Sequence, residues 1–395
     1  MNYSHEMKSE QVRNTFRTLQ LMISLKRYKS HDTKTSRGVI LKNLILAFLA
    51  VSCCLLATGT VCVAGEPPGV GPAEAMNLNF STWHLLQSDD VQTVWLPMLD
   101  ELKSRTNGSI NYTLYAGGSL GSGPEHYDIV ASGRSDMGYA TLTWTPGRFP
   151  LSDVLSLPAG IQSKEVATDI GNDVYERILS QEFKDAEVLE VNGCIDSCLW
   201  TKKPVRTLED LAGLKIRTPG GMQTRCLKAL GAEPVFMPMD QVYLSMQNGS
   251  IDGVVTCPPN FLTYRLYEVA GCAALETFGC VSEGLFMNQD SWNRTPGDLK
   301  PVIMDVCHNP YRTTKSLNES DYTRMIDRIA EKGVAVYDLP QEESERWYSR
   351  FQNASRQWAE DMEKLGLPGK EAIKIFNEEC EERGIRCVAF PEEWR

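Results

Sequence analysis

The sequence has few of the residues on which catalysis and metal binding usually depend. It contains five histidines in 395 residues, and no cysteine and histidine stand at the spacing of zinc ligands. A Cys-x-x-Cys pair, a Gly-Lys-Ser/Thr phosphate loop and a recognisable pair of catalytic carboxylates are also missing. We therefore expect no metal, no cofactor and no enzymatic activity.

The chain also lacks any excess of positive charge. Its net charge is −11, and the first 65 residues hold nine of its Lys and Arg and only three of its Asp and Glu. Removing them leaves 31 basic residues against 48 acidic ones, a net charge near −17. Because such a surface repels nucleic acid, we expect no nucleic-acid partner.

Long apolar runs are absent with one exception, residues 44–64, which carry no charge. The run follows Arg37 and Lys42 and ends in the small residues Val63, Ala64 and Gly65, an arrangement typical of a cleaved export signal. The alternative is an uncleaved membrane anchor, since 21 apolar residues can also span a bilayer. We expect residues 1–65 to be an export signal or an N-terminal anchor, and the protein to reach the periplasm.

Residues 117–121, Gly-Gly-Ser-Leu-Gly, match the G-x-S-x-G pattern of hydrolases. In that motif a helix starts directly after the serine, whereas here Leu-Gly-Ser-Gly precedes Pro124, a favoured first residue of a helix. Only His308 could complete a catalytic triad with the usual order. A hydrolase is therefore a minor alternative.

Strand and helix patterns alternate along the chain, which predicts an α/β fold with largely parallel sheets. Strands are expected at 76–81, 110–115 and 214–218, and helices at 91–105 and 222–230. Residues 130–141 resemble residues 246–256, each with a glycine that ends a helix (Gly133, Gly249) and an aspartate three residues later. This repeat favours two similar lobes.

In the last third of the chain, the spacing of apolar residues predicts long amphipathic helices. Trp347, Tyr348, Phe351 and Trp358 recur at helical spacing, which is typical of core packing rather than of a ligand site. Nine cysteines follow residue 65, an odd number that leaves at least one thiol unpaired. Their spacing would let Cys194 pair with Cys198, or Cys380 with Cys387, but does not decide between disulfides and inert buried thiols.

Arg217 is the residue with the clearest binding potential. It ends the expected strand 214–218, just before Pro-Gly-Gly, and ligands of open α/β sheets bind at the carboxyl ends of strands. Its planar guanidinium can donate two parallel hydrogen bonds to a carboxylate. A surface arginine or an ion pair within one lobe is the alternative. In the binding role it would face a wet cleft.

Several stretches resemble the DctP-type substrate-binding proteins of TRAP (tripartite ATP-independent periplasmic) transporters. The most specific run is Lys-Pro-Val-Arg-Thr-Leu-Glu-Asp-Leu-Ala-Gly-Leu-Lys-Ile-Arg-Thr-Pro-Gly at 203–220. The other matching stretches are 230–243, 249–253, 267–269, Gly121, Glu125, 133–137 and 288–292. The similarity spans roughly residues 76–380.

The resemblance implies a two-lobed, periplasmic-binding-protein-like fold with a ligand cleft between the lobes and a long C-terminal helical region. Lobe 1 would comprise 76–199, completed by about 286–320, and lobe 2 would comprise 200–285, completed by about 321–395. Arg217 matches the family's carboxylate-binding arginine. The other expected pocket residues are Trp83, Tyr139, Trp144, Trp200, Phe236 and Thr256.

The resemblance further implies an extracytoplasmic receptor that captures a small organic acid and delivers it to TRAP membrane permease subunits. The sialic-acid branch carries a second pocket arginine and an asparagine where this chain has 194–200 and 254–256, so sialic acid is disfavoured. The aromatic residues favour an aromatic or apolar carboxylate. We expect a monomer, and a membrane-tethered sensor with the same fold remains the alternative.

Overall fold

The structure is a computed structural model that describes residues 75–312 and 319–395. The expected export segment, residues 44–64, lies outside this described part. Within it, no helix combines the length and the apolar character needed to cross a membrane.

The described residues form two β-sheets. Sheet A has the order β2-β1-β3-β10-β4, with strands at Ile110–Tyr115, Met76–Thr82, Met137–Thr141, Ser282–Asn288 and Ala186–Gly193. Sheet B has the order β11-β9-β5-β8-β6-β7, with strands at Ala335–Tyr337, Cys272–Ala274, Cys198–Thr201, Gly253–Thr256, Lys215–Thr218 and Glu233–Phe236. The α/β prediction is confirmed, and so are the strands expected at 76–81 and 110–115, to within one residue.

Both sheets are mixed, which corrects the expectation of largely parallel sheets, because β10 and β5 run against both of their neighbours. In sheet A, β1 pairs in parallel with β2 and β3, whereas β10 is antiparallel to β3 and to β4. In sheet B, β6 is parallel to β7 and β8, whereas β5 is antiparallel to β8 and β9. The chain passes between the sheets three times, from β4 to β5, from β9 to β10 and from β10 to β11. The first two of these connecting segments hydrogen-bond to each other through Cys194 N to Val281 O and Ser197 N to Gly279 O.

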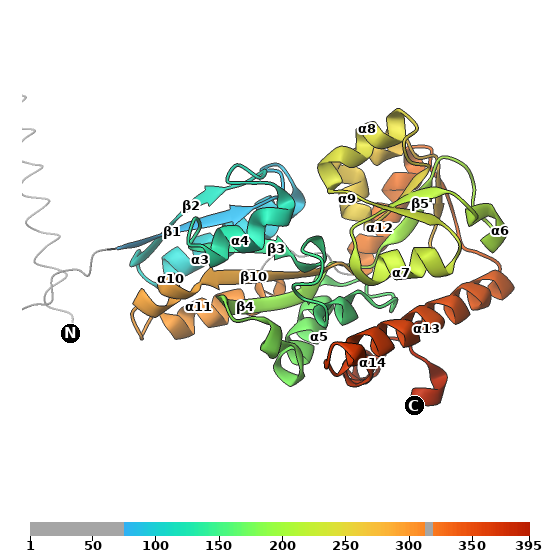
Figure 1. Cartoon of the computed structure of the whole chain (residues 1–395). Coiled ribbons are helices and arrows are strands. Elements are labelled where there is room, and N and C mark those ends of the chain that lie inside the picture. The colour runs from blue at the N-terminus through green and yellow to red at the C-terminus, as the bar shows by residue number, and fades with distance from the viewer. Residues whose placement is uncertain (1–74, 313–318) are drawn as a thin grey trace, which may run out of the picture. The chain divides into compact units, whose positions relative to one another are not determined.

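Helices cover both sheets (Figure 1). Those next to sheet A are α3 (Leu96–Arg105), α4 (His126–Ala131), α5 (Lys164–Arg177), α10 (Gln289–Arg294) and α11 (Lys300–Cys307). Those next to sheet B are α6 (Leu208–Leu211), α7 (Gly221–Ala229), α8 (Val242–Gln247), α9 (Pro258–Thr263) and α12 (Glu319–Glu331). Two C-terminal helices follow, α13 (Gln341–Lys364) and α14 (Gly369–Glu382).

Short 3₁₀ segments punctuate the connections; they are η2 (Gly123–Glu125), η3 (Leu142–Trp144), η4 (Ser152–Ser156), η5 (Leu179–Glu182), η6 (Met239–Gln241), η7 (Leu266–Glu268), η8 (Pro310–Arg312) and η9 (Glu392–Trp394). The helix expected at 91–105 begins with wider π-helical bonding, η1 (Asp90–Trp95), before α3. Pro97 stands at this junction, and its missing N–H interrupts regular helical bonding there.

The C-terminal helices join the two halves of the described fold. α13 packs against α7 beside sheet B and against α14, which in turn packs against α5 beside sheet A. Trp347, Phe351 and Trp358 of α13 are buried, and Phe278, from the segment between β9 and β10, meets the first two edge-on. The expectation that the aromatic residues of this stretch form core is confirmed for these three, whereas Tyr348 is only partly buried and donates its hydroxyl to Glu276.

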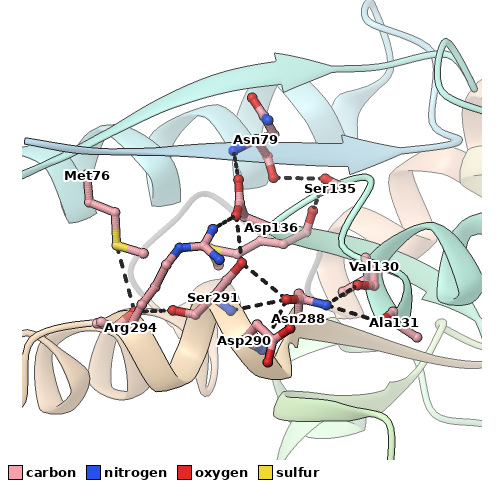
Figure 2. A network of polar contacts seen from close by, with 12 residues as sticks. Met76, Asn79, Val130, Ala131, Ser135, Asp136, Asn288, Asp290, Ser291 and Arg294 are labelled. Carbon is pink, nitrogen blue, oxygen red and sulfur yellow. Dashed lines mark hydrogen bonds and ion pairs between the residues drawn. The ribbon is translucent and has the colours of Figure 1, made fainter.

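A polar network fixes β10 and α10 against the first strands of sheet A (Figure 2). Asp136 accepts from Asn79 N at 2.9 Å and from the Ser291 hydroxyl at 2.6 Å, and it also pairs with Arg294. Asn288 donates to the carbonyls of Val130 and Ala131. The network therefore brings together two stretches that the sequence singled out separately, 133–137 and 288–292. Gly133 turns the chain here with φ 75°, as its predicted role requires.

Candidate functional site

A cavity of about 190 Å³ lies between loops that follow strands of the two sheets. From the sheet A side it is lined by Trp83, Leu85, Gly117, Gly118, Gly121, Ser122, Gly123 and Trp144. From the sheet B side it is lined by Pro238, Met239, Asp240 and Tyr264. Because both halves contribute, a change in their separation would change the size of the cavity.

Arg217 lies beside this cavity, on β6. It is only 2% exposed, so the structure corrects the expectation that it faces a wet cleft. Its Nε donates to Met237 O at 2.9 Å and its Nη1 to Val255 O at 3.1 Å. Arg217 itself does not line the cavity, but its hydrogen bond to Met237 O places it next to residues 238–240, which do.

Arg217 forms no direct salt bridge. Among the described residues, no carboxylate lies within 4.0 Å of its guanidinium, and the hydrogen bonds of its side chain are those of Nε and Nη1 to backbone carbonyls. Burial lowers the pKa of Arg217 to about 10, while Cys257, Tyr264 and Asp240 act in the opposite direction. A buried cation with hydrogen-bonding capacity to spare is a favourable site for an anion that replaces the lost water.

The turn after Arg217 approaches the other half of the fold. Gly220 has φ 114°, and a Cβ atom there would lie 2.7 Å from Thr143 O and 3.6 Å from the Phe236 ring. Both the left-handed conformation and the close backbone contact require glycine. Pro219, Gly220 and Gly221 thus set α7 and Arg217 next to the η3 segment that carries Trp144.

Trp83 and Trp144 form an aromatic wall of the cavity. Their ring centroids are 4.8 Å apart, and Trp83 also stacks on His84 at 4.0 Å. Both indole N–H groups are buried without a hydrogen-bond partner in the described residues. The wall can therefore offer apolar ring surface to a ligand, while its indole N–H groups are not open to the cavity.

The other expected pocket residues do not line this cavity. Trp200 is fully buried, stacks on Phe261 at 3.9 Å and donates its Nε1 to Thr256 O at 2.8 Å. Thr256 is buried beside it, and Phe236 is 45% exposed next to Gly220. Tyr139 donates to Glu283 at 2.9 Å and to Asn192 at 3.1 Å.

Tyr139 belongs to a buried polar cluster beneath the aromatic wall. Glu283 also accepts from the Thr141 hydroxyl at 3.1 Å and lies 3.6 Å from Lys164 Nζ. Nearby Glu190 is almost fully buried, and this burial raises the pKa of Glu190 to about 8. The cluster joins β3, β4 and β10, the central and crossing strands of sheet A, just before the chain leaves for sheet B.

Sequence reasoning missed Asp240 and Tyr264, which line the cavity and act on Arg217. Asp240 stood in the matched stretch 230–243, but nothing in its spacing indicates that it approaches Arg217. In the part of the chain that the structure describes, no group of three or more metal-ligating side chains comes together.

The fold has two β-sheets flanked by helices, connecting segments that cross between them, and a cavity between their loops. These features define a two-lobed ligand-binding protein. The sequence pattern of the bacterial extracellular solute-binding proteins of family 7, DctP, matches residues 84–361. The chain therefore belongs to this family, which comprises substrate-binding receptors of TRAP transporters rather than enzymes.

Individual relatives agree with this assignment. A solute-binding protein of Albidiferax ferrireducens is 25% identical over 62% of this chain and 75% of its own length. A TRAP solute-binding protein of Rhodoferax ferrireducens, solved with copurified benzoate, has a TM-score of 0.72 at 23% identity and covers 78% of this chain and 99% of its own. One of Bordetella bronchiseptica, solved with bound mandelate, has a TM-score of 0.70 at 21% identity over 78% and 99%.

Proposed function

We propose that this receptor binds the carboxylate of a small aromatic acid, with Arg217 as the carboxylate anchor. The observation that carries the proposal is the buried guanidinium of Arg217, which has no direct salt bridge and lies next to residues that line the cavity. Burying an isolated charge is costly, and a ligand carboxylate would offset that cost by supplying both the opposite charge and the missing acceptors.

The aromatic wall supports the rest of the ligand assignment. Trp83 and Trp144 offer two apolar ring faces in contact with the cavity, which suit an aromatic body better than a polyhydroxylated one. The benzoate and mandelate of the two structural relatives are ligands of this kind.

The ligand would reach a TRAP permease from an exported protein. Family members act outside the cytoplasm with permease subunits, and we propose cleavage near Glu66 and a monomeric mature protein for this chain. N-terminal sequencing and light scattering of the exported material test these two points.

A thermal-shift panel tests the ligand class. At about a hundredfold excess over Kd, a ligand adds roughly 2.7 kcal/mol to the stability of the folded state. Benzoate and mandelate should raise the melting temperature by several degrees, whereas succinate and glucuronate should not. Shifts with succinate or glucuronate alone would show that the aromatic assignment is wrong.

A further inference from the structure

Cys194 and Cys257 are the cysteines whose positions have chemical consequences. Their sulfur atoms lie 3.2 Å apart although 63 residues separate them in sequence. Both side chains are buried, with 6% and 2% of their surface exposed, in the same apolar cluster as Trp83 and Trp144. Among the nine described cysteines, theirs is the pair of sulfurs in contact.

The remaining described thiols have other surroundings. Cys198 Sγ lies 3.1 Å from the Tyr322 hydroxyl, and Cys387 Sγ contacts Pro158 O at 3.5 Å. All nine described cysteines, Cys194 and Cys257 included, are free thiols in the structure, and the sulfurs of the two pairs that the sequence spacing allowed, Cys194 with Cys198 and Cys380 with Cys387, are not in contact. The spatial neighbour of Cys194 comes instead from the far end of β8.

The two cysteines connect structurally distinct segments. Cys194 begins the segment that crosses from β4 to β5, and its N–H donates to Val281 O of the returning segment. Cys257 follows β8 directly and is the residue before α9. Its two predecessors carry the carbonyls of Val255 and Thr256, which accept from Arg217 and Trp200. A bond between the sulfurs would therefore tie the crossing segment to the strand end that supports Arg217.

From this placement we propose that Cys194 and Cys257 form a disulfide bond in the exported protein, a covalent link between the crossing segment and the wall behind the binding arginine. The oxidising environment that such a bond needs rests on the export proposed above, whereas the distance between the two sulfur atoms does not depend on it. The Sγ atoms need to approach by only about 1.1 Å to reach the length of a disulfide, about 2.05 Å.

The chemistry needs an oxidant that is itself a disulfide, such as oxidised glutathione or a disulfide-bearing oxidoreductase. The Cys257 thiolate attacks one sulfur of the oxidant, forms a mixed disulfide and releases one thiol. The Cys194 sulfur then loses its proton, attacks Cys257 Sγ and expels the second thiol. Two protein thiols are oxidised and one external disulfide is reduced to two thiols.

Burial sets the time at which this exchange happens. Since both sulfurs are enclosed in the folded protein, the oxidant reaches them while the chain is still folding, and the finished bond is then shielded from reductants. Closing a loop of this length reduces the conformational freedom of the unfolded chain, so the disulfide should raise the melting temperature by roughly 5 to 10 °C.

The test refolds the purified chain in a glutathione redox buffer, which makes it independent of where the protein resides in the cell. After blocking of free thiols and proteolysis, mass spectrometry should find Cys194 and Cys257 in one cross-linked peptide, and Cys307 as a blocked thiol. Recovery of Cys194 and Cys257 as blocked thiols, or of Cys194 joined to Cys198, would overturn the proposal.

Variants supply an independent readout. Oxidised wild type should melt above the dithiothreitol-reduced protein, and this difference should vanish in Cys194→Ser, in Cys257→Ser and in the double variant. Cys307→Ser, which changes an equally buried thiol of a different apolar cluster, should retain the difference. If the double variant keeps the full redox-dependent shift, another bond is responsible and the assignment is wrong.

Discussion

At the scale of single residues, the proposed anchor is a charge that is almost fully buried. Arg217 is held by two backbone carbonyls, so its position is set before any ligand arrives. A preorganised donor of this kind costs little to immobilise on binding. Because Arg217 has no direct salt bridge, a ligand carboxylate bound there would supply the opposite charge and favour the occupied state.

Substitution of Arg217 is the direct test of this view. Truncating one partner of a buried, hydrogen-bonded charge pair costs about 2 to 5 kcal/mol, or roughly 30-fold to several-thousand-fold in affinity. Arg217→Ala should weaken binding of the acid by that range in calorimetric titration. Arg217→Lys should weaken it less, because the charge remains while the planar fork is lost.

Arg206→Ala is the matched control, since Arg206 is an exposed arginine close to the same sheet. Its affinity should equal that of wild type. Binding within about threefold of wild type by a correctly folded Arg217→Ala would refute the anchoring role, because ordinary surface substitutions produce changes of that size.

At the scale of elements, the turn from β6 into α7 determines where Arg217 stands relative to the other half. Gly220 occupies a left-handed conformation and lies against the backbone of Thr143. Gly231, which follows α7, has a similar φ of 92°, but a Cβ atom added there would have no other atom within 4 Å. Comparing alanine substitutions at the two glycines therefore separates the cost of a positive φ from the cost of the contact with Thr143.

Gly220→Ala should lower the free energy of unfolding by about 2 to 4 kcal/mol, because backbone strain adds to the clash with Thr143 O. Gly231→Ala should lower it by only about 1 kcal/mol, the cost of strain alone. Urea denaturation of both variants measures the difference. Equal losses would show that the turn tolerates the contact and that Thr143 does not constrain it.

The elements also show which parts of the site a sequence can predict. The strand that carries Arg217 was predictable because Leu214 and Ile216 alternate with charged residues and Pro-Gly-Gly ends the strand. The buried stripe of α13 was predictable from its helical spacing. Both patterns lie within one short stretch of sequence. They are predictive because an element with one buried face keeps its apolar residues at a regular spacing, whatever it packs against.

Contacts between distant segments were not predictable. Asp240 follows β7 and Tyr264 follows α9, and both line the cavity. Their proximity cannot be read from either segment of the sequence alone. The neighbour of Cys194 is Cys257 rather than the nearby Cys198, because the crossing segment turns toward the end of β8. Burial of Arg217 likewise depends on carbonyls from two other segments.

At the scale of the whole described fold, the cavity belongs to both halves. Trp83 and Trp144 come from the sheet A side, whereas Asp240 and Tyr264 come from the sheet B side, close to Arg217. The halves are joined by the crossing segments and by the packing of α13 and α14. A ligand that contacts both sides gains most when they approach, so binding should shift the population toward a closed arrangement.

Small-angle X-ray scattering should therefore give a smaller radius of gyration at saturating ligand than in the empty protein. The contraction should require the anchor, because a ligand held on only one side has no differential affinity for the closed arrangement. Arg217→Ala, measured at the same acid concentration, should keep the radius of the empty protein. An unchanged profile for wild type at full occupancy, established by calorimetry on the same sample, would show that the ligand binds without closure and that the two halves are already in their final arrangement.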